Sequence, residues 1–153
     1  MREQLHSEYA DADDSPGLML WRVTNAWQAA QRAALQPFGL THVQFVLLAS
    51  LTWLQAEQPI TQRAIADHAG TDPMMTSQVL RALELKGLIK RSSHPTDSRA
   101  RALFVTGRGA ELANAAVLAV EETDRSFFTP LQAGQQDFTG MLRRLVDRPR
   151  GSP

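Results

Sequence analysis

The sequence contains no cysteine in its 153 residues. Disulfide bonds, thiolate metal sites and thiol-based redox switches are therefore excluded. Long apolar runs are missing as well, because Gln44, Ser50 and Thr52 interrupt the most apolar stretch, residues 43–54. A membrane-spanning helix needs about 18 or more consecutive apolar residues. We therefore expect no membrane span in this chain.

Signals for export, metal binding and catalysis are also absent. The first six residues have no apolar segment of the kind found in secretion signals, so the sequence predicts a cytoplasmic protein. The four histidines have no metal-ligand spacing. Ser77 and Ser126 lack the histidine and acidic partners of a nucleophile, and there is no glycine-rich phosphate loop. We expect no enzyme, no cofactor and no metal site.

The formal net charge is zero, but the charges are unevenly distributed. Residues 1–60 carry a net charge of −3 and residues 109–153 a net charge of −1. Residues 61–108 carry +4, from eight Lys and Arg against four acids. A basic segment of this kind is typical of a surface that faces a polyanion. Charges scattered over a solvated surface would give the same count. The net charge alone therefore does not distinguish a polyanion-binding surface from an ordinary solvated one, and sequence motifs are needed to do so.

Helix start and stop signals divide the first third of the chain. The charge-rich residues 1–14 predict an extended arm. Ser15–Pro16 is an N-cap followed by proline at the first helical position, and this helix should end near Pro37. Thr41 and Gln44 have the capping-box spacing and open a second, apolar helix. The apolar face of the first helix is expected to carry Leu20, Val23, Trp27, Ala30 and Ala34.

Two further helices follow, separated by a tight turn. Thr61 caps the first, and Gly70 ends it. Asp72, with proline directly after it, caps the second, and Gly87 ends that one. A short helix, a turn at residues 69–71 and an amphipathic helix form a helix-turn-helix pattern. The inward face of the second helix is expected to carry Met75, Val79, Ala82 and Leu83.

A two-stranded ribbon is predicted directly after this pair of helices. Residues 88–92 and 101–106 have strand character, and a polar turn that contains proline lies between them. A ribbon in this position forms a wing. Its tip carries Arg99, flanked by Arg91 and Arg101. Arginine on a protruding tip suits the narrow minor groove of DNA, where the negative potential is strong.

The remaining segments predict dimerisation. A long alanine-rich helix should run to about residue 128, a last helix should span 135–146, and residues 148–153 should form a loose tail. The apolar surfaces of the first helix and of the alanine-rich helix exceed what a wing and three short helices can cover. We therefore expect a homodimer built from residues 16–36 and 110–147.

Several local sequences carry a family resemblance. They are GLTHVQF at residues 39–45, LELKGLI at 83–89, and PTDSR at 95–99 followed by LFVT at 103–106. Together with the order of the elements over residues 16–147, they resemble the MarR family of bacterial regulators. The resemblance implies a mostly α fold with a small β-wing in one domain, residues 15–147. A winged helix-turn-helix domain (59–106) would be flanked by N- and C-terminal dimerisation and effector-pocket helices (15–57 and 107–147).

The resemblance also implies a function. The chain would be a sequence-specific DNA-binding transcriptional regulator, a repressor that a small aromatic or lipophilic ligand releases from a pseudo-palindromic operator. Residues 71–86 would lie in the major groove and the wing in the minor groove of double-stranded DNA. The expected effector-binding residues are Trp21, Arg22, His42 and Phe45. An alternative remains open, in which the winged helix is a protein–protein interaction module without DNA binding.

The predicted DNA contacts combine two kinds of side chain. Glutamine pairs with adenine, arginine with guanine, and the methionine side chain packs against the thymine methyl group. Arginines at the wing bind through charge and groove width, and Asp97 is expected to pair with Arg99 and fix its rotamer. The full predicted set is Met74, Thr76, Ser77, Gln78, Arg81, Arg91, Asp97, Arg99 and Arg101.

Overall fold

The computed structural model of the chain describes residues 5–54, 59–93, 96 and 101–147. Within these residues, helices dominate and a small antiparallel sheet is the only β-structure, so the predicted fold class is confirmed. The elements are η1 (Ala12–Asp14), α1 (Pro16–Leu35), η2 (Gln36–Phe38), α2 (His42–Leu54), β1 (Ile60–Thr61), α3 (Gln62–Ala69), α4 (Pro73–Leu85), β2 (Ile89–Ser93), β3 (Arg101–Val105), α5 (Gly107–Phe128), η3 (Thr129–Gly134) and α6 (Gln135–Val146).

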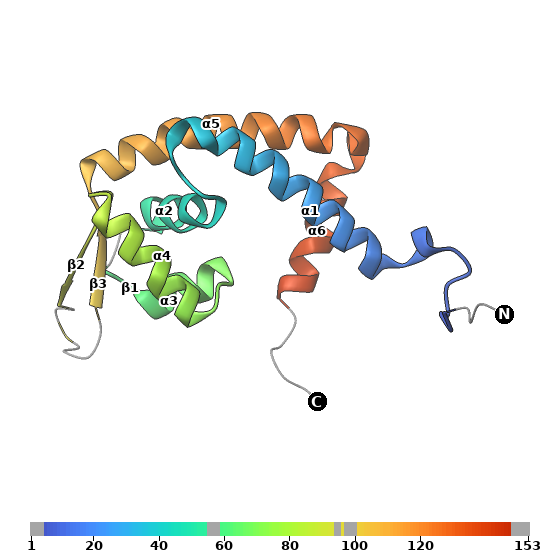
Figure 1. Cartoon of the computed structure of the whole chain (residues 1–153), viewed down its shortest axis with the longest axis horizontal. Helices are drawn as coiled ribbons and strands as arrows, with labels where there is room; N and C mark the ends of the chain where they lie inside the picture. The colour runs from blue at the N-terminus through green and yellow to red at the C-terminus, as the bar shows by residue number, and fades with distance from the viewer. Residues whose placement is uncertain (1–4, 55–58, 94–95, 97–100, 148–153) are drawn as a thin grey trace.

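The molecule is an arch (Figure 1). The long helices α1 and α5 contact each other and form the top of the arch. One end of the arch has α2, α3, α4 and the sheet below it, and the other end has α6 below it. The helix-turn-helix and its wing are therefore separated in space from the C-terminal helix.

The helix caps follow the sequence signals. Ser15, Thr61, Asp72 and Thr106 each accept a hydrogen bond from a backbone N–H in the first turn of α1, α3, α4 and α5, respectively. These bonds satisfy N–H groups that have no partner inside the helix. The predicted capping box also forms: Thr41 Oγ1 accepts from the Gln44 N–H, and Gln44 Oε1 accepts from the Thr41 N–H, both at 3.2 Å.

The hydrophobic core is centred on α2. This helix contacts α1, α3, α4, α5 and β3, so it joins the long helices to the helix-turn-helix. Burial of the leucine and isoleucine side chains here is the main stabilising term, at about 25 cal/mol per Å² of apolar surface. The side chains that are at most 2% exposed include Leu35, Leu47, Leu48, Leu51, Ile65, Leu80, Leu83, Leu88, Ile89 and Leu103.

The sheet has one strand more than the sequence predicted. Its order is β1-β3-β2, and both pairs are antiparallel. The additional strand, β1, contains two residues and pairs Ile60 with Leu103 and Thr61 with Ala102. A two-residue segment has no measurable periodicity, which explains why the pattern did not reveal it. By this pairing, the wing is attached to the N-terminus of α3.

The start of α5 is fixed to the turn after α4. The Thr106 N–H donates to the Leu88 carbonyl at 3.0 Å, and the Thr106 hydroxyl donates to the Gly87 carbonyl at 2.8 Å. A Cβ at Gly109 would lie 2.0 Å from the same Leu88 carbonyl oxygen. Only glycine permits this close approach. The helix-turn-helix and α5 therefore meet at a rigid junction.

Among the described residues, no single helix is both long and apolar enough to cross a membrane. In the same part of the chain, the two segments Pro16–Phe38 and His42–Leu54 together have sufficient length and apolar composition, but they are bent by 73° relative to each other. The second member of that pair is α2, the core helix described above.

Candidate nucleic-acid interface

Helix α4 presents a row of side chains to the solvent. Met74 is 76% exposed, and Gln78 and Arg81 are also exposed at the following helical steps. Ser77, beside them, is half-buried. Because residues three and four apart lie on one helical face, these side chains form a continuous outer surface opposite the core. The row combines an apolar, an amide and a guanidinium group, which are the chemistries that read base edges.

Two expectations for α4 are wrong, although its predicted inward residues Val79 and Ala82 are half-buried and Leu83 is fully buried. Thr76, predicted to contact DNA, is fully buried. Its hydroxyl donates to the Asp72 carbonyl at 2.7 Å and lies 2.6 Å from the Thr71 hydroxyl, so its polar group is satisfied inside the protein. Met75, predicted to face inward, is 40% exposed. Thr76 fixes the turn of the helix-turn-helix and does not reach a ligand.

The basic residues of the wing differ in exposure. Lys90 and Arg101 are exposed on β2 and β3. Arg91 is different, because its side chain is only 16% exposed and contacts groups on α3 and α4. Asp97 and Arg99, the predicted wing tip, lie outside the described residues. The structure therefore exposes Arg101 to solvent and directs Arg91, which lies on the same face of the sheet, into the molecule.

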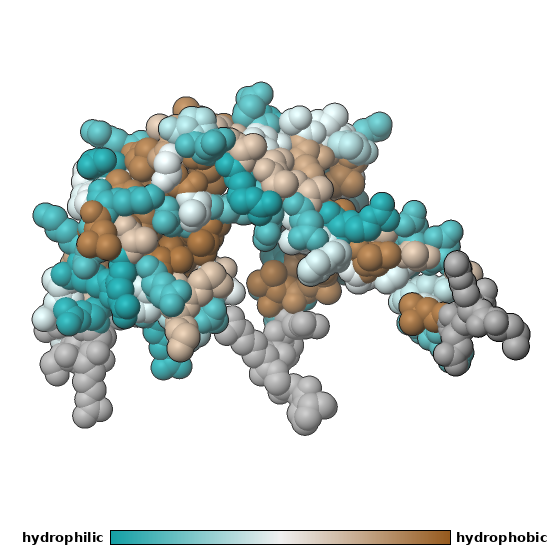
Figure 2. Space-filling model, viewed as in Figure 1, coloured by the Kyte–Doolittle hydropathy of each residue, from teal (hydrophilic) through white to brown (hydrophobic). Residues whose placement is uncertain are grey.

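The basic segment of the sequence becomes one end of the arch. Figure 2 shows hydrophilic side chains gathered over the end that carries the sheet and α4. Its exposed cationic residues in the described part of the chain include Arg63, Arg81, Lys86, Lys90, Arg101 and Arg108. This end therefore has the charge that a phosphate backbone attracts.

A second polar cluster lies where α1, α2 and α5 meet. One oxygen of Asp124 on α5 accepts a hydrogen bond from the Trp27 indole N–H at 2.8 Å and another from the Gln31 side-chain amide at 2.7 Å. The Trp27 ring packs edge-on against His42, with ring centroids 5.0 Å apart. Gln31 is fully buried, and its side-chain oxygen has no hydrogen-bond partner among the described residues. A buried acceptor without a partner is unusual in a protein core, so this cluster is a second candidate functional site.

The electrostatics of this cluster favour a neutral histidine. Burial of the imidazole lowers the pKa of His42 below its ordinary value of 6.5. The Asp124 carboxylate acts in the opposite direction and raises this pKa, whereas the Arg32 guanidinium lowers it further. The net result is a pKa below the ordinary value, so His42 is uncharged at neutral pH.

The four predicted effector residues do not come together. His42 lies in the cluster, and the buried Phe45 follows one turn later on α2. Trp21 is 68% exposed, and Arg22 forms an ion pair with Asp13 at 2.7 Å. Trp21 precedes Trp27 by six residues, which is about 9 Å along the helix. The residues that sequence reasoning missed are Gln31 and Asp124, and no local pattern distinguishes them.

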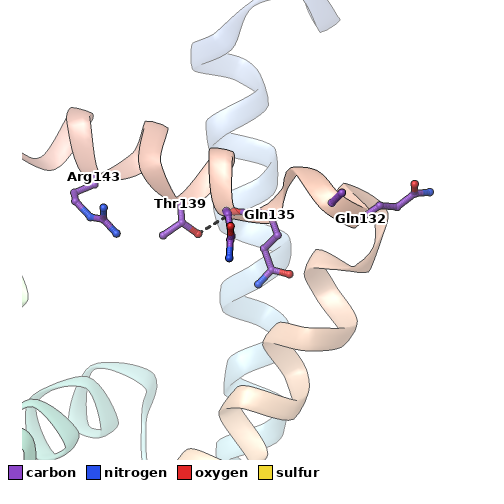
Figure 3. Close-up of a pocket in the computed structure, with 6 residues that line it drawn as sticks. Gln132, Gln135, Thr139 and Arg143 are labelled. Atoms are coloured by element: carbon purple, nitrogen blue, oxygen red, sulfur yellow. Dashed lines mark hydrogen bonds between the residues drawn. The ribbon is translucent and has the colours of Figure 1, made fainter.

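A surface cavity of about 730 Å³ lies away from both sites, between η3 and α6. Figure 3 shows Gln132, Gln135, Thr139 and Arg143 along its wall. The Thr139 hydroxyl is occupied by a bond to the Gln135 carbonyl at 3.0 Å. Apart from Ala133, the described lining side chains are polar; all are exposed, and none is aromatic. This cavity does not have the chemistry of the predicted aromatic effector site.

The family model described as "MarR family" matches residues 40–100. The chain is 40% identical over 141 residues to the "Uncharacterized HTH-type transcriptional regulator YdcH" of Bacillus subtilis, covering 92% of this chain and 96% of the relative. It is 35% identical to the "HTH-type transcriptional repressor Rv2887" of Mycobacterium tuberculosis, covering 88% and 96%.

Solved structures agree with the fold. The M. tuberculosis MarR family protein Rv2887 superposes with a TM-score of 0.63 at 34% identity, covering 88% of this chain and 96% of that one. CouR from Rhodococcus jostii, solved with p-coumaroyl-CoA, gives a TM-score of 0.82 at 21% identity, covering 94% and 100%. The MepR–DNA complex from S. aureus gives 0.79 at 21% identity, covering 88% and 98%. The family match on the helix-turn-helix and wing, and the relatives that align over nearly their whole length, show that this chain belongs to the MarR family and is a transcriptional regulator rather than an enzyme.

Proposed function

We propose that the protein binds an operator in duplex DNA as a homodimer and represses transcription until a small aromatic or lipophilic ligand releases it. The observation that carries this proposal is the exposed row of Met74, Gln78 and Arg81 on α4, next to a basic wing. A helix with its side chains is about 10–12 Å across, so it fits the major groove, which is roughly 12 Å wide, and the 13 residues of α4 give it a length of about 20 Å. The MepR structure with DNA and the relatives named repressors support the same function.

We assign separate roles to the two DNA-binding elements. On α4, Gln78 pairs with adenine, Arg81 with guanine, and Met74 packs against a thymine methyl group, so α4 reads the sequence. On the wing, Arg99 and Arg101 enter the minor groove and bind through charge. Ser77 adds a hydroxyl contact beside Gln78, and Asp97 orients Arg99 through an ion pair.

Dimerisation follows from apolar surface that the single chain leaves uncovered. On α1, Leu20 is 55% exposed and Val23 is 43% exposed. On α6, Met141 is 51%, Leu145 is 59% and Val146 is 80% exposed, and Figure 2 shows hydrophobic residues on this helix. Apolar faces of this extent are covered in stable proteins. We assign residues 15–57 and 107–147 to the dimer and effector helices and 59–106 to the winged helix-turn-helix, in a single domain.

Two-fold symmetry of the protein determines the form of the operator. A dimer of helix-turn-helix units binds half-sites about one helical turn, roughly 10 bp, apart. The operator should therefore be a pseudo-palindrome. A regulator of this kind works where the chromosome is, which is why we assign the protein to the cytoplasm.

The polar cluster of Trp27, Gln31, His42 and Asp124 is our proposed effector site. It lies at the junction of the dimerisation helices with the core helix α2. The free acceptor of Gln31 and the aromatic face of Trp27 suit an aromatic ligand with a polar group, and Phe45 lies one turn further along α2. CouR, a structural neighbour, was solved with an aromatic acyl-CoA.

Selection of bound duplexes from a random pool tests the proposal and yields the operator. On that operator, Gln78→Ala should cost about 1–3 kcal/mol while binding to random DNA and the salt dependence stay unchanged. Arg99→Ala should weaken binding to all duplexes and reduce the slope of log affinity against log salt by about one per protomer. Failure to enrich any duplex at low salt would refute DNA binding and favour the protein–protein interaction module.

A further inference from the structure

Arg91 lies on the inward face of the wing. In the sheet, Arg91 pairs with Leu103 and Ile89 pairs with Val105. Residues two apart on a strand share a face, and directly paired residues lie on the same side of the sheet. Ile89 and Leu103 are both 1% exposed. Arg91 therefore continues the row of side chains that packs into the core, whereas the adjacent Lys90 is exposed on the opposite face.

The guanidinium of Arg91 bridges three elements. Its Nη2 donates to the Ser77 carbonyl on α4 at 3.3 Å, and its Nη1 donates to Gln62 Oε1 at the start of α3 at 3.5 Å. Its Nε lies 3.6 Å from Glu84 Oε2, further along α4. A guanidinium is planar and presents donors in several fixed directions. The Arg91 side chain on β2 therefore restrains the placement of β2, α3 and α4 relative to one another.

The spacing of Ser77 and Glu84 on α4 determines which motions of the helix Arg91 can restrain. Ser77 and Glu84 are seven residues apart, which is about 10 Å along the helix and two turns on the same face. A group held at both positions restrains the translation of α4 along its axis and its rotation about that axis. The exposed row on α4 keeps its direction only while that rotation is fixed.

From this geometry we infer that Arg91 is a positioning residue that holds the recognition helix α4 at a fixed angle to the wing, and is not a phosphate contact. The inference rests on the proposed function of α4 and the wing in DNA binding. Its positive charge is paired with the partly exposed Glu84 carboxylate, and only 16% of the Arg91 side chain is exposed. Arg91 therefore contributes to specificity by orienting α4, and adds little to the charge that faces DNA.

Three variants separate the two roles in titrations on operator and random duplexes over a salt series. Arg91→Met removes the charge and donors but keeps an apolar stem, Arg91→Lys keeps the charge without the planar fork, and Arg101→Met is the matched control on the neighbouring strand. Both Arg91 variants should lose about tenfold in the ratio of operator to random affinity, equivalent to one base contact, with the salt slope unchanged. Arg101→Met should keep that ratio and reduce the slope by about one per protomer. Wild-type-like binding by Arg91→Lys, with a reduced slope for Arg91→Met, would overturn the inference.

The variant Glu84→Gln should change DNA affinity in opposite directions, depending on whether Arg91 contacts phosphate or positions α4. If Arg91 contacts phosphate, removing the nearby carboxylate charge should tighten binding to every duplex. If Arg91 positions α4, losing this partner should instead lower the ratio of operator to random affinity by about threefold or more. Uniformly tighter binding by Glu84→Gln therefore counts against the positioning role.

Amide hydrogen exchange without DNA provides a readout that does not depend on the proposed function. Arg91→Met should accelerate exchange in α4 by about tenfold while α5 stays protected as in the wild type. Unchanged protection of α4 would refute the contact itself. If the wild type bound no duplex but α4 lost protection in the variant, the proposed function would fail and the positioning role would stand.

Discussion

Asp124 joins the two long helices through a single oxygen, and its removal should destabilise the fold strongly. That oxygen accepts from Trp27 at 2.8 Å and from Gln31 at 2.7 Å. In Asp124→Ala, the Gln31 amide is left without an acceptor at a site that is 0% exposed. An unpaired buried donor costs about 1–3 kcal/mol, and the half-buried Trp27 N–H adds roughly 1 kcal/mol. We therefore expect a loss of about 2–4 kcal/mol.

Urea unfolding at one fixed protomer concentration measures this loss, because the stability of a dimer depends on concentration. With a slope of about 2 kcal/mol per M, the midpoint should fall by about 1–2 M. Asp124→Asn retains an acceptor oxygen without the charge, so it should cost about half as much. The control is Glu122→Ala on the same helix, which removes an exposed ion pair with Arg125 and should cost less than about 0.5 kcal/mol. A midpoint for Asp124→Ala no lower than that of the control would refute the reasoning.

Three further predictions concern the pKa of His42, the exposed methionines and the backbone at Gln132. Because burial lowers the pKa of His42 when folded, the unfolded chain binds more protons below pH 6.5, so stability should fall as the pH drops below that value; His42→Gln should flatten this part of the curve of urea midpoint against pH. Peroxide should weaken operator binding only by converting exposed thioethers to sulfoxides, detected as added oxygen by mass spectrometry. Replacing Met74 and Met75 by Leu should preserve binding after peroxide, whereas Met141→Leu should not. Gln132 has φ 49° and ψ −126°, a backbone conformation that glycine adopts at lower cost. Gln132→Gly should therefore raise the free energy of unfolding by about 1 kcal/mol, detected as a higher urea midpoint; a lower midpoint would show that this backbone is unstrained.

Helix boundaries were predictable because local chemistry sets them. The caps at Ser15, Thr61 and Asp72 depend on one side chain and the next three backbone groups. Gly70 and Gly87 end their helices with φ of 69° and 73°, a conformation that glycine adopts without steric cost. These signals need no knowledge of the remainder of the fold. The order of elements, and the family resemblance with it, followed from them.

The rotation of α4 was not predictable from its apolar residues. Two faces compete, one with Met75 and Val79 and one with Thr76 and Leu80, and the apolar count favours the first. The structure buries Thr76 and Leu80 fully and leaves Val79 half-buried. The Asp72 carbonyl and the Thr71 hydroxyl, both in the preceding turn, satisfy the Thr76 hydroxyl, so local hydrogen bonding admits a polar residue that hydrophobicity alone would place outside.

The site residues show the same division between local and tertiary information. The exposed positions of Gln78 and Arg81 followed from helical periodicity, as did a basic wing. The inward direction of Arg91 was available from strand alternation after Ile89, but its neighbour Lys90 made the segment look uniformly basic. Asp124 gave no signal, because its partners lie 93 and 97 residues away in the sequence.

The junction at Gly109 makes α5 a lever arm. Its 22 residues extend for about 33 Å, and one end is fixed to the turn after α4 by the Leu88 carbonyl. A tilt of about 5° at the dimer end would displace the winged helix by roughly 3 Å, close to the rise of about 3.4 Å per base pair. A change at the α1–α5 contact too small to alter the core would then move both recognition helices out of step with the operator by one base pair. The close backbone contact at Gly109 would transmit this small tilt of α5 to the winged helix.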